Sequence, residues 1–209
     1  MSDISTYGGR PMQTPAVWAV LGLWAAGIAT LARNDTLRAD PGSLPLPVAV
    51  AVMVPPLLYL AAYRVSPGWR AWVQGLDLAW VIGVQCFRVI GVMFVFLWAL
   101  GRLPTIFALV AGLGDVAIGL SALGVTLATL RGTDGWQGQA RALTLFGLLD
   151  FVAAFGTATL TAEGFPLQFP GEPLPVMMQQ WPLAMVPGFL VPTCIILHLM
   201  AWQKLRQEE

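Results

Sequence analysis

Six long apolar runs limit what this chain of 209 residues can fold into more than any other feature of its sequence. A helix rises about 1.5 Å per residue, so about 20 apolar residues cross the roughly 30 Å of hydrocarbon in a bilayer. Within lipid every backbone polar group needs a partner inside the protein, which leaves helices and closed barrels as spanning structures. The runs cover residues 16–32, 44–63, 78–100, 103–130, 142–160 and 182–203. We therefore predict an all-α, polytopic membrane protein with six transmembrane helices.

Composition and charge support a lipid surrounding. Charged residues make up 11% of the chain and apolar residues 57%, whereas soluble domains have about 25% and 45–50%. Eleven basic and eleven acidic side chains cancel, which argues against a nucleic-acid partner. The segments between the runs are too short to fold alone. We expect residues 1–209 to form one helical-bundle domain in a lipid bilayer.

The distribution of basic residues predicts the orientation of this bundle. Six spans put both termini on one side, and the side richer in Lys and Arg is expected to face the cytoplasm. The side opposite the termini has only three basic residues, Arg33, Arg38 and Arg102. Both termini are therefore predicted to be cytoplasmic. The basic residues on the terminal side are Arg10, Arg64, Arg70, Arg131, Arg141, Lys204 and Arg206.

Prolines concentrate in the second and the last run. A proline inside a helix removes a backbone donor and disturbs the preceding turn, so we expect both helices to be kinked or locally opened. The prolines are Pro45, Pro47, Pro55 and Pro56 in the second run, and Pro182, Pro187 and Pro192 in the last.

The segment before the last run ends in Val-Met-Met-Gln-Gln-Trp, residues 176–181. A short interfacial helix here would hold Met177, Met178 and Trp181 at the level of the lipid headgroups. Such a helix either anchors the protein at the interface or forms a lid over an external vestibule, and the sequence leaves both interpretations open.

Three charges inside the apolar runs, Arg88, Asp115 and Asp150, are the strongest functional signal. A charge at the middle of a bilayer costs at least about 2.5 to 3.5 kcal/mol, so these side chains should face the bundle interior and one another. Arginine stays charged and needs an anion. Two ionised aspartates would leave a surplus negative charge, so we expect one carboxyl to hold a proton. Such a site suits proton coupling or the binding of a cationic or polar ligand.

Helical phase extends this candidate site. Gln85 lies three residues before Arg88, on nearly the same face, and His198 is the only histidine in the chain. Asp77, at the edge of the third run, is expected to be solvated or to begin the helix. Small residues that allow close helix packing accompany each buried aspartate: Ala108, Gly112, Gly119, Ala122 and Thr126 beside Asp115, and Gly147, Ala154, Thr157 and Thr161 beside Asp150.

The motifs of nucleotide hydrolysis and of the commonest hydrolase and metalloprotease mechanisms are absent from the sequence. The chain has no G-x-x-x-x-G-K-[ST], G-x-S-x-G or H-E-x-x-H pattern. One histidine cannot supply both axial ligands of a haem b, so that cofactor is excluded unless a partner subunit supplies the second ligand. A metal ion at Asp115, Asp150 and His198 would be opposed by Arg88. Cys86 and Cys194 are expected to be small buried hydrophobic residues. We expect no metal and no cofactor, and we favour a protein that is not an enzyme.

Several blocks of sequence carry a resemblance to known proteins. In their order along the chain they resemble a group of uncharacterised bacterial integral membrane proteins, over about residues 72–202, whereas the first two spans match nothing specific. This resemblance implies a multi-pass protein of the bacterial inner membrane in which Arg88, the two aspartates and His198 are pattern positions, and it implies no activity. The blocks are Gln85–Gly91, Gly101–Pro104 with Phe107 and Ala108, Gly112–Asp115, Gly147–Asp150, and Phe189–Thr193 with His198.

Two functions fit these observations best. The first is an inner-membrane carrier or conduit for a proton, an ion or a small polar solute. The second is a non-transporting subunit that binds a lipid, quinone, pigment or partner protein in a homo-oligomer or larger membrane complex, since nine Trp and ten Phe offer apolar surface. Buried Arg–Asp pairs can also simply fix helix register, and an intramembrane enzyme with an aspartate as general acid or base is a third alternative. We favour the first, with Arg88, Asp115, Asp150, Gln85 and His198 as its site.

Overall fold

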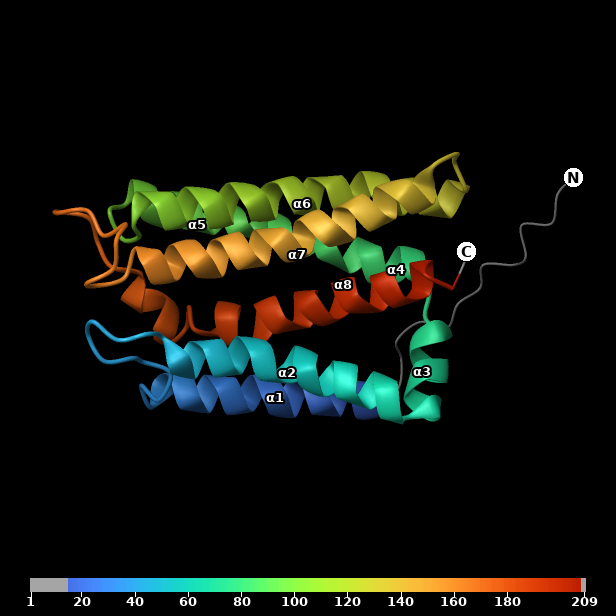
Figure 1. Cartoon of the computed structure of the whole chain (residues 1–209), viewed down its shortest axis with the longest axis horizontal. Coiled ribbons are helices and arrows are strands. Elements are labelled where there is room, and N and C mark those ends of the chain that lie inside the picture. The colour runs from blue at the N-terminus through green and yellow to red at the C-terminus, as the bar shows by residue number, and fades with distance from the viewer. Residues whose placement is uncertain (1–14, 208–209) are drawn as a thin grey trace, which may run out of the picture.

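The computed structural model describes residues 15–207, which form an all-α bundle (Figure 1). Six helical segments in this part of the chain are long and apolar enough to cross a membrane, so the predicted class and number of spans are confirmed. These segments are α1 (Pro15–Arg33), α2 (Leu46–Val65), the third span (Leu78–Ala99), α6 (Thr105–Arg131), α7 (Trp136–Leu160) and the last span (Val186–Leu205).

Two spans begin at residues other than those at which their apolar runs begin. α7 begins at Trp136, after the left-handed Gly135 with φ 78°, because its first turns contain polar residues that an apolar run excludes. The last span begins at Val186, not at residue 182. It consists of a π-helical turn, η3 (Val186–Leu190), followed by α8 (Val191–Leu205).

The prolines affect the two helices differently. The π-helical η3 contains Pro187 and ends two residues before Pro192, so the local opening expected in the last span is confirmed. α2 stays helical through Pro55 and Pro56. The third span contains no proline, yet its middle is a 3₁₀-helix, η1 (Val84–Gly91), between α4 (Leu78–Gly83) and α5 (Val92–Ala99).

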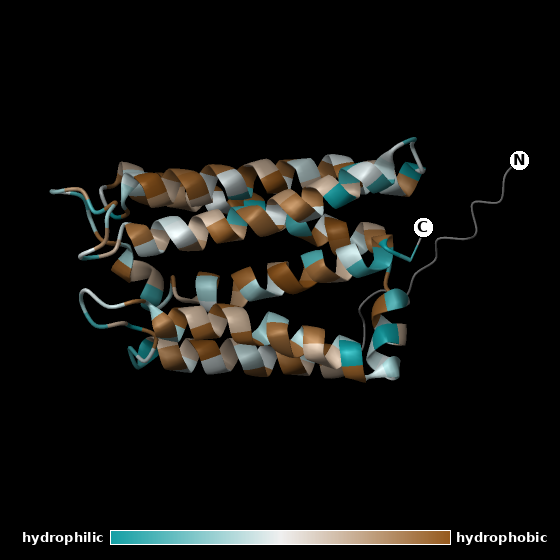
Figure 2. Ribbon diagram, viewed as in Figure 1, coloured by the Kyte–Doolittle hydropathy of each residue, from teal (hydrophilic) through white to brown (hydrophobic). Residues whose placement is uncertain are grey.

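The spans lie roughly parallel to one long axis, with α8 between the α5–α6–α7 group and the α1–α2 pair, and the short α3 lies across this axis (Figure 1). The end of α8, the short helix α3 (Pro67–Gln74) and the turn 132–135 lie at one end, which we name the C-terminal face. Segments 34–45, 100–104 and 161–185 lie at the other end, which we name the loop face. Hydrophilic residues gather at both ends, with apolar helix surface between them (Figure 2).

Capping interactions fix the segments at the C-terminal face. Ser66 begins α3 by accepting a hydrogen bond from the Trp69 amide at 3.2 Å, and Lys204 Nζ on α8 donates to the last carbonyl of α3, at Gln74, at 2.6 Å. Asp77 Oδ1 accepts from the Trp80 amide at 3.0 Å. The expectation that Asp77 begins the third span is therefore confirmed.

Candidate functional site

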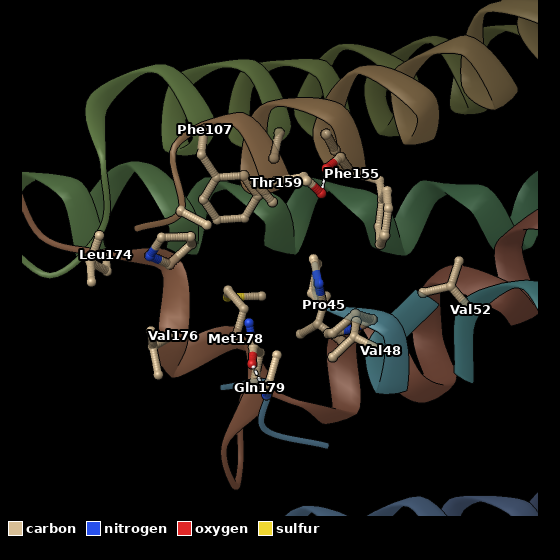
Figure 3. Close-up of a pocket in the computed structure, with 18 of the residues that line it drawn as sticks. Pro45, Val48, Val52, Phe107, Phe155, Thr159, Leu174, Val176, Met178 and Gln179 are labelled. Atoms are coloured by element: carbon tan, nitrogen blue, oxygen red, sulfur yellow. Dashed lines mark hydrogen bonds between the residues drawn. The ribbon is translucent and has the colours of Figure 1, made fainter. Parts of the chain in front are cut away.

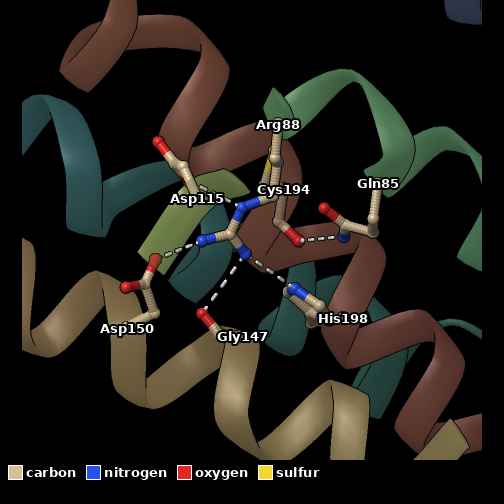
Figure 4. Close-up of polar contacts among 7 residues, drawn as sticks. All are labelled: Gln85, Arg88, Asp115, Gly147, Asp150, Cys194 and His198. Carbon is tan, nitrogen blue, oxygen red and sulfur yellow. Dashed lines mark hydrogen bonds and ion pairs between the residues drawn. The ribbon is translucent and has the colours of Figure 1, made fainter. Parts of the chain in front are cut away.

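Arg88 lies at the centre of a buried ionic cluster (Figure 4). Its side chain is 2% exposed, and its Nε donates to Asp115 Oδ1 at 2.7 Å. Its Nη2 donates to Asp150 Oδ2. The three charges come from η1, α6 and α7, so helices distant in sequence meet at one guanidinium. We name Arg88, Asp115 and Asp150 the ionic cluster.

The other side of the guanidinium faces α7 and α8. Arg88 Nη1 lies 3.2 Å from His198 Nε2 and donates to the Gly147 carbonyl at 3.5 Å. A guanidinium can only donate hydrogen bonds, so the imidazole accepts through Nε2 and carries its proton on Nδ1. His198 is thus a neutral partner of Arg88 in this arrangement, and the two carboxylates supply the only negative charge that contacts the guanidinium among the described residues.

The 3₁₀ conformation of η1 brings Gln85 onto the same side as Arg88. Residues three apart eclipse one another in a 3₁₀-helix, and both side chains face α8. Gln85 is 1% exposed and its Nε2 donates to the Cys194 carbonyl at 3.1 Å. Its Oε1 has no hydrogen-bond partner within residues 15–207. Gln85 therefore ties η1 to α8 beside the ionic cluster.

Glycines make room for each ionisable side chain of the site. A Cβ at Gly91 would meet the Asp115 side chain, a Cβ at Gly114 would meet the Asp150 carboxylate, and a Cβ at Gly147 would meet the His198 ring. The charged side chains thus lie directly over the backbone of a neighbouring helix. Gly91, Gly114 and Gly147 thus have a packing role in the same sequence blocks as Arg88, Asp115 and Asp150.

A cavity of about 230 Å³ extends from the loop face to Asp115 and Asp150 of the ionic cluster. Phe107, Phe155 and Thr159 line one side of it, and Pro45, Val48 and Val52 line the opposite side (Figure 3). Arg38, Asp40 and Glu163 lie at its mouth, in the loops of that face. A second cavity of about 30 Å³ lies beside Arg88 and shares Asp115 and Phe151 with the first.

The two signs of charge differ in their access to the large cavity. Asp115 and Asp150 are 18% and 12% exposed and line it. The guanidinium lies behind them, with Cζ 4.0 Å from the centre of the Phe151 ring. A molecule that enters from the loop face therefore meets carboxylate oxygens and aromatic rings before it meets the buried cation.

Side-chain hydrogen bonds hold the segments of the loop face in place beside the cavity mouth. Gln179, in the 3₁₀-helix η2 (Pro175–Gln179), accepts from the Ala39 amide at 2.8 Å. Glu172 accepts from Thr105 Oγ1 at 2.5 Å and from the Thr105 amide at 3.3 Å, at the start of α6. Sequence reasoning missed these residues, because polar side chains in a loop carry no periodic signal.

Of the three residues predicted to lie at the headgroup level, Met178 is buried inside the bundle. Met178 is 8% exposed, packs in an apolar cluster with Phe94 and Phe107, and lines the cavity. Trp181 is 43% exposed. The short helix folds inward because the apolar ends of α5 and α6 offer Met178 a site away from solvent.

The fold and the ionic cluster define a multi-pass helical membrane protein with a cavity that ends on buried carboxylates. The chain belongs to the family described as Domain of unknown function (DUF8737), which matches residues 45–206. This match includes α2, so the expectation that the second span resembles nothing specific is wrong, whereas α1 lies outside the matched range. Comparison with curated proteins and with solved structures finds no match.

Proposed function

We propose that this protein is a carrier or conduit of the bacterial inner membrane for a proton, an ion or a small polar solute, which loads at Asp115 and Asp150. The observation that carries the proposal is the cavity that ends on both carboxylates while Arg88 lies behind them. A structural ion pair needs no such access. A transport site needs it, because the substrate must reach the middle of the bilayer.

The balance of charge favours a site that exchanges cations. One guanidinium and two ionised carboxylates sum to a formal charge of −1, which a low-dielectric site resists. A proton or another monovalent cation at the carboxylates restores neutrality. The cluster is thus complete only with such a cation, and the cavity provides the route for its exchange.

We further propose that the cavity opens to the outside of the cell. The basic residues of the C-terminal face are expected to lie in the cytoplasm, which puts the loop face and the cavity mouth on the external side. These basic residues are Arg64, Arg70, Arg131, Arg141, Lys204 and Arg206.

Proton movement in proteoliposomes tests the proposal. The purified protein is reconstituted with a trapped pH indicator, and protons are driven by a potassium diffusion potential or by gradients of sodium, lithium or a quaternary ammonium salt. We expect a flux in the wild type that Asp115→Asn and Asp150→Asn reduce to the level of empty liposomes, because one carboxylate and one arginine leave no proton to exchange. Asp134→Asn makes the same chemical change in an exposed turn and should leave the flux intact.

The same preparation separates this function from that of a non-transporting subunit. Absence of flux under every gradient, or equal flux in the wild type and both site variants, overturns the proposal. A chromophore or a stoichiometric partner protein that co-purifies in mild detergent with a transport-inactive protein supports the subunit role instead.

A further inference from the structure

The shape and lining of the large cavity restrict what can occupy it. An apolar cavity of roughly 150 Å³ holds a benzene molecule, so about 230 Å³ holds one ring with a compact substituent. Four phenylalanines lie along its walls: Phe94, Phe107, Phe151 and Phe155. A hydrated inorganic ion gains little from such walls, whereas an apolar group gains about 25 cal/mol for each Å² removed from water.

Charge along the cavity favours a cation. Its inner end has Asp115 and Asp150, and its mouth has Asp40 and Glu163 against the single basic residue Arg38. Arg88 does not contact a ligand in the cavity, because its side chain is 2% exposed and lies on the far side of both carboxylates. An anion would meet only acidic groups at the inner end.

Aromatic faces also favour an organic over an inorganic cation. Phe94 and Phe107 lie with ring centres 5.8 Å apart and planes tilted by 49°, at the loop side of the ionic cluster. Ring faces attract cations electrostatically, and quaternary ammonium groups are recognised by such aromatic walls. Phe151 is already engaged, since its ring contacts the Arg88 guanidinium. Phe94, Phe107 and Phe155 line the cavity without contacting the guanidinium.

From these observations we infer that the cavity binds a small organic cation with one apolar body, the size of a benzylammonium ion, with its charge at Asp115 and Asp150. This inference rests on the proposed function, of which it specifies the substrate class. The bound cation replaces the proton that the empty cluster holds, so the formal charge of the cluster is zero in both states. A proton leaves for each cation that binds.

Competition with protons follows from this exchange. Lowering the pH fills the carboxylates with protons and weakens binding of the cation. The charged and titratable groups that surround the two aspartates are Arg88 from η1, His198 and Cys194 from α8, each aspartate for the other, and Arg38, Asp40 and Glu163 at the mouth.

Benzyltrimethylammonium is a suitable probe, because its permanent charge prevents it from crossing lipid as a neutral base. Binding to the protein in detergent is measured by calorimetry, and proton release by an indicator in weak buffer. We expect binding with release of a proton, and about ten- to hundredfold weaker binding of tetramethylammonium, which lacks the ring. Tetraphenylphosphonium, with four rings, exceeds the cavity and should not compete with the probe.

Matched variants locate the binding site. Asp115→Asn and Asp150→Asn should abolish binding, and Asp134→Asn should not. Phe107→Leu should weaken binding about threefold or more through loss of the ring face. Phe146→Leu makes the same change at a side chain that is 61% exposed on α7 and away from the cavity, and it should leave the affinity unchanged.

The outcomes distinguish this inference from the proposed function. Failure of the probe to bind, or equal affinity for the probe and tetramethylammonium, overturns the organic-cation class even when proton flux in proteoliposomes persists. Binding that releases a proton, together with absence of flux under every gradient, supports the ligand class and overturns transport. Loss of binding in Phe146→Leu or Asp134→Asn overturns the assignment to this cavity.

Discussion

At the scale of single residues, Arg88 stabilises two carboxylates that would otherwise repel each other inside the membrane. Replacement by Met removes the guanidinium but keeps much of its apolar volume. Breaking a buried ion pair by removing one partner costs about 3 to 5 kcal/mol, because the other charge is left uncompensated. We expect Arg88→Met to lower the free energy of unfolding by about this amount, as measured by titrating detergent-solubilised protein with sodium dodecyl sulfate.

A compensated variant distinguishes lost charge balance from lost packing. In Arg88→Met combined with Asp115→Asn and Asp150→Asn no charge of the cluster remains, so most of the lost stability should return. The electrostatic explanation is contradicted when the triple variant is no more stable than Arg88→Met alone.

The meeting of these three side chains could be predicted from the sequence, because a bilayer leaves buried charges no partner except one another. The contact of Arg88 with the Gly147 carbonyl could not be predicted from the sequence, because it depends on the rotation of α7 about its own axis. His198 was recognised as part of the pattern, but its role as a neutral acceptor follows only from the 3.2 Å approach of Arg88 Nη1.

At the scale of elements, the close approach of η1 to α6 determines where the arginine lies. A Cβ at Gly119 would lie 2.6 Å from the Val89 amide nitrogen and 3.2 Å from the Arg88 carbonyl carbon. Backbone atoms cannot give way as a flexible side chain can. We expect Gly119→Ala to separate η1 from α6, to destabilise the protein by about 1 to 3 kcal/mol and to weaken binding of the cationic probe.

Gly124 provides the matched control for this substitution. It lies on the same helix, and a Cβ there would have nothing within 4 Å. Gly124→Ala should not lower thermal stability, because alanine has the higher helix propensity, and it should leave probe affinity unchanged. Equal effects of the two substitutions would mean that helix propensity, and not contact with η1, determines the result.

The sequence predicts some helical segments better than others. Long apolar runs predict the spans because length and hydropathy alone decide membrane insertion. The 3₁₀ segment η1 left no such signal, because no proline interrupts residues 78–100 and its geometry depends on the packing of α6 against it. The sequence also did not predict helix α3. Its eight residues lie between two spans, and its last carbonyl is capped by Lys204, which is distant in sequence.

At the scale of the whole molecule, the two ends of the bundle have different structures. The large cavity opens at the loop face. Toward the C-terminal face, a large apolar cluster packs around Tyr59, Ile82 and Leu205, and Tyr59 is hydrogen-bonded to Gln203. A carrier in this conformation loads from the loop face, so the direction of loading depends on which face lies outside the cell.

Labelling of single introduced cysteines measures this orientation in the whole protein. Ser43 lines the cavity at the loop face and Thr133 lies in the turn at the C-terminal face, and both are exposed. A membrane-impermeant maleimide should label Ser43→Cys in intact cells, and should label Thr133→Cys only after permeabilisation. The native Cys86 and Cys194 lie within spans, so the wild type provides the background. The reverse pattern would put the cavity mouth in the cytoplasm, and the protein would then load its cation from inside the cell.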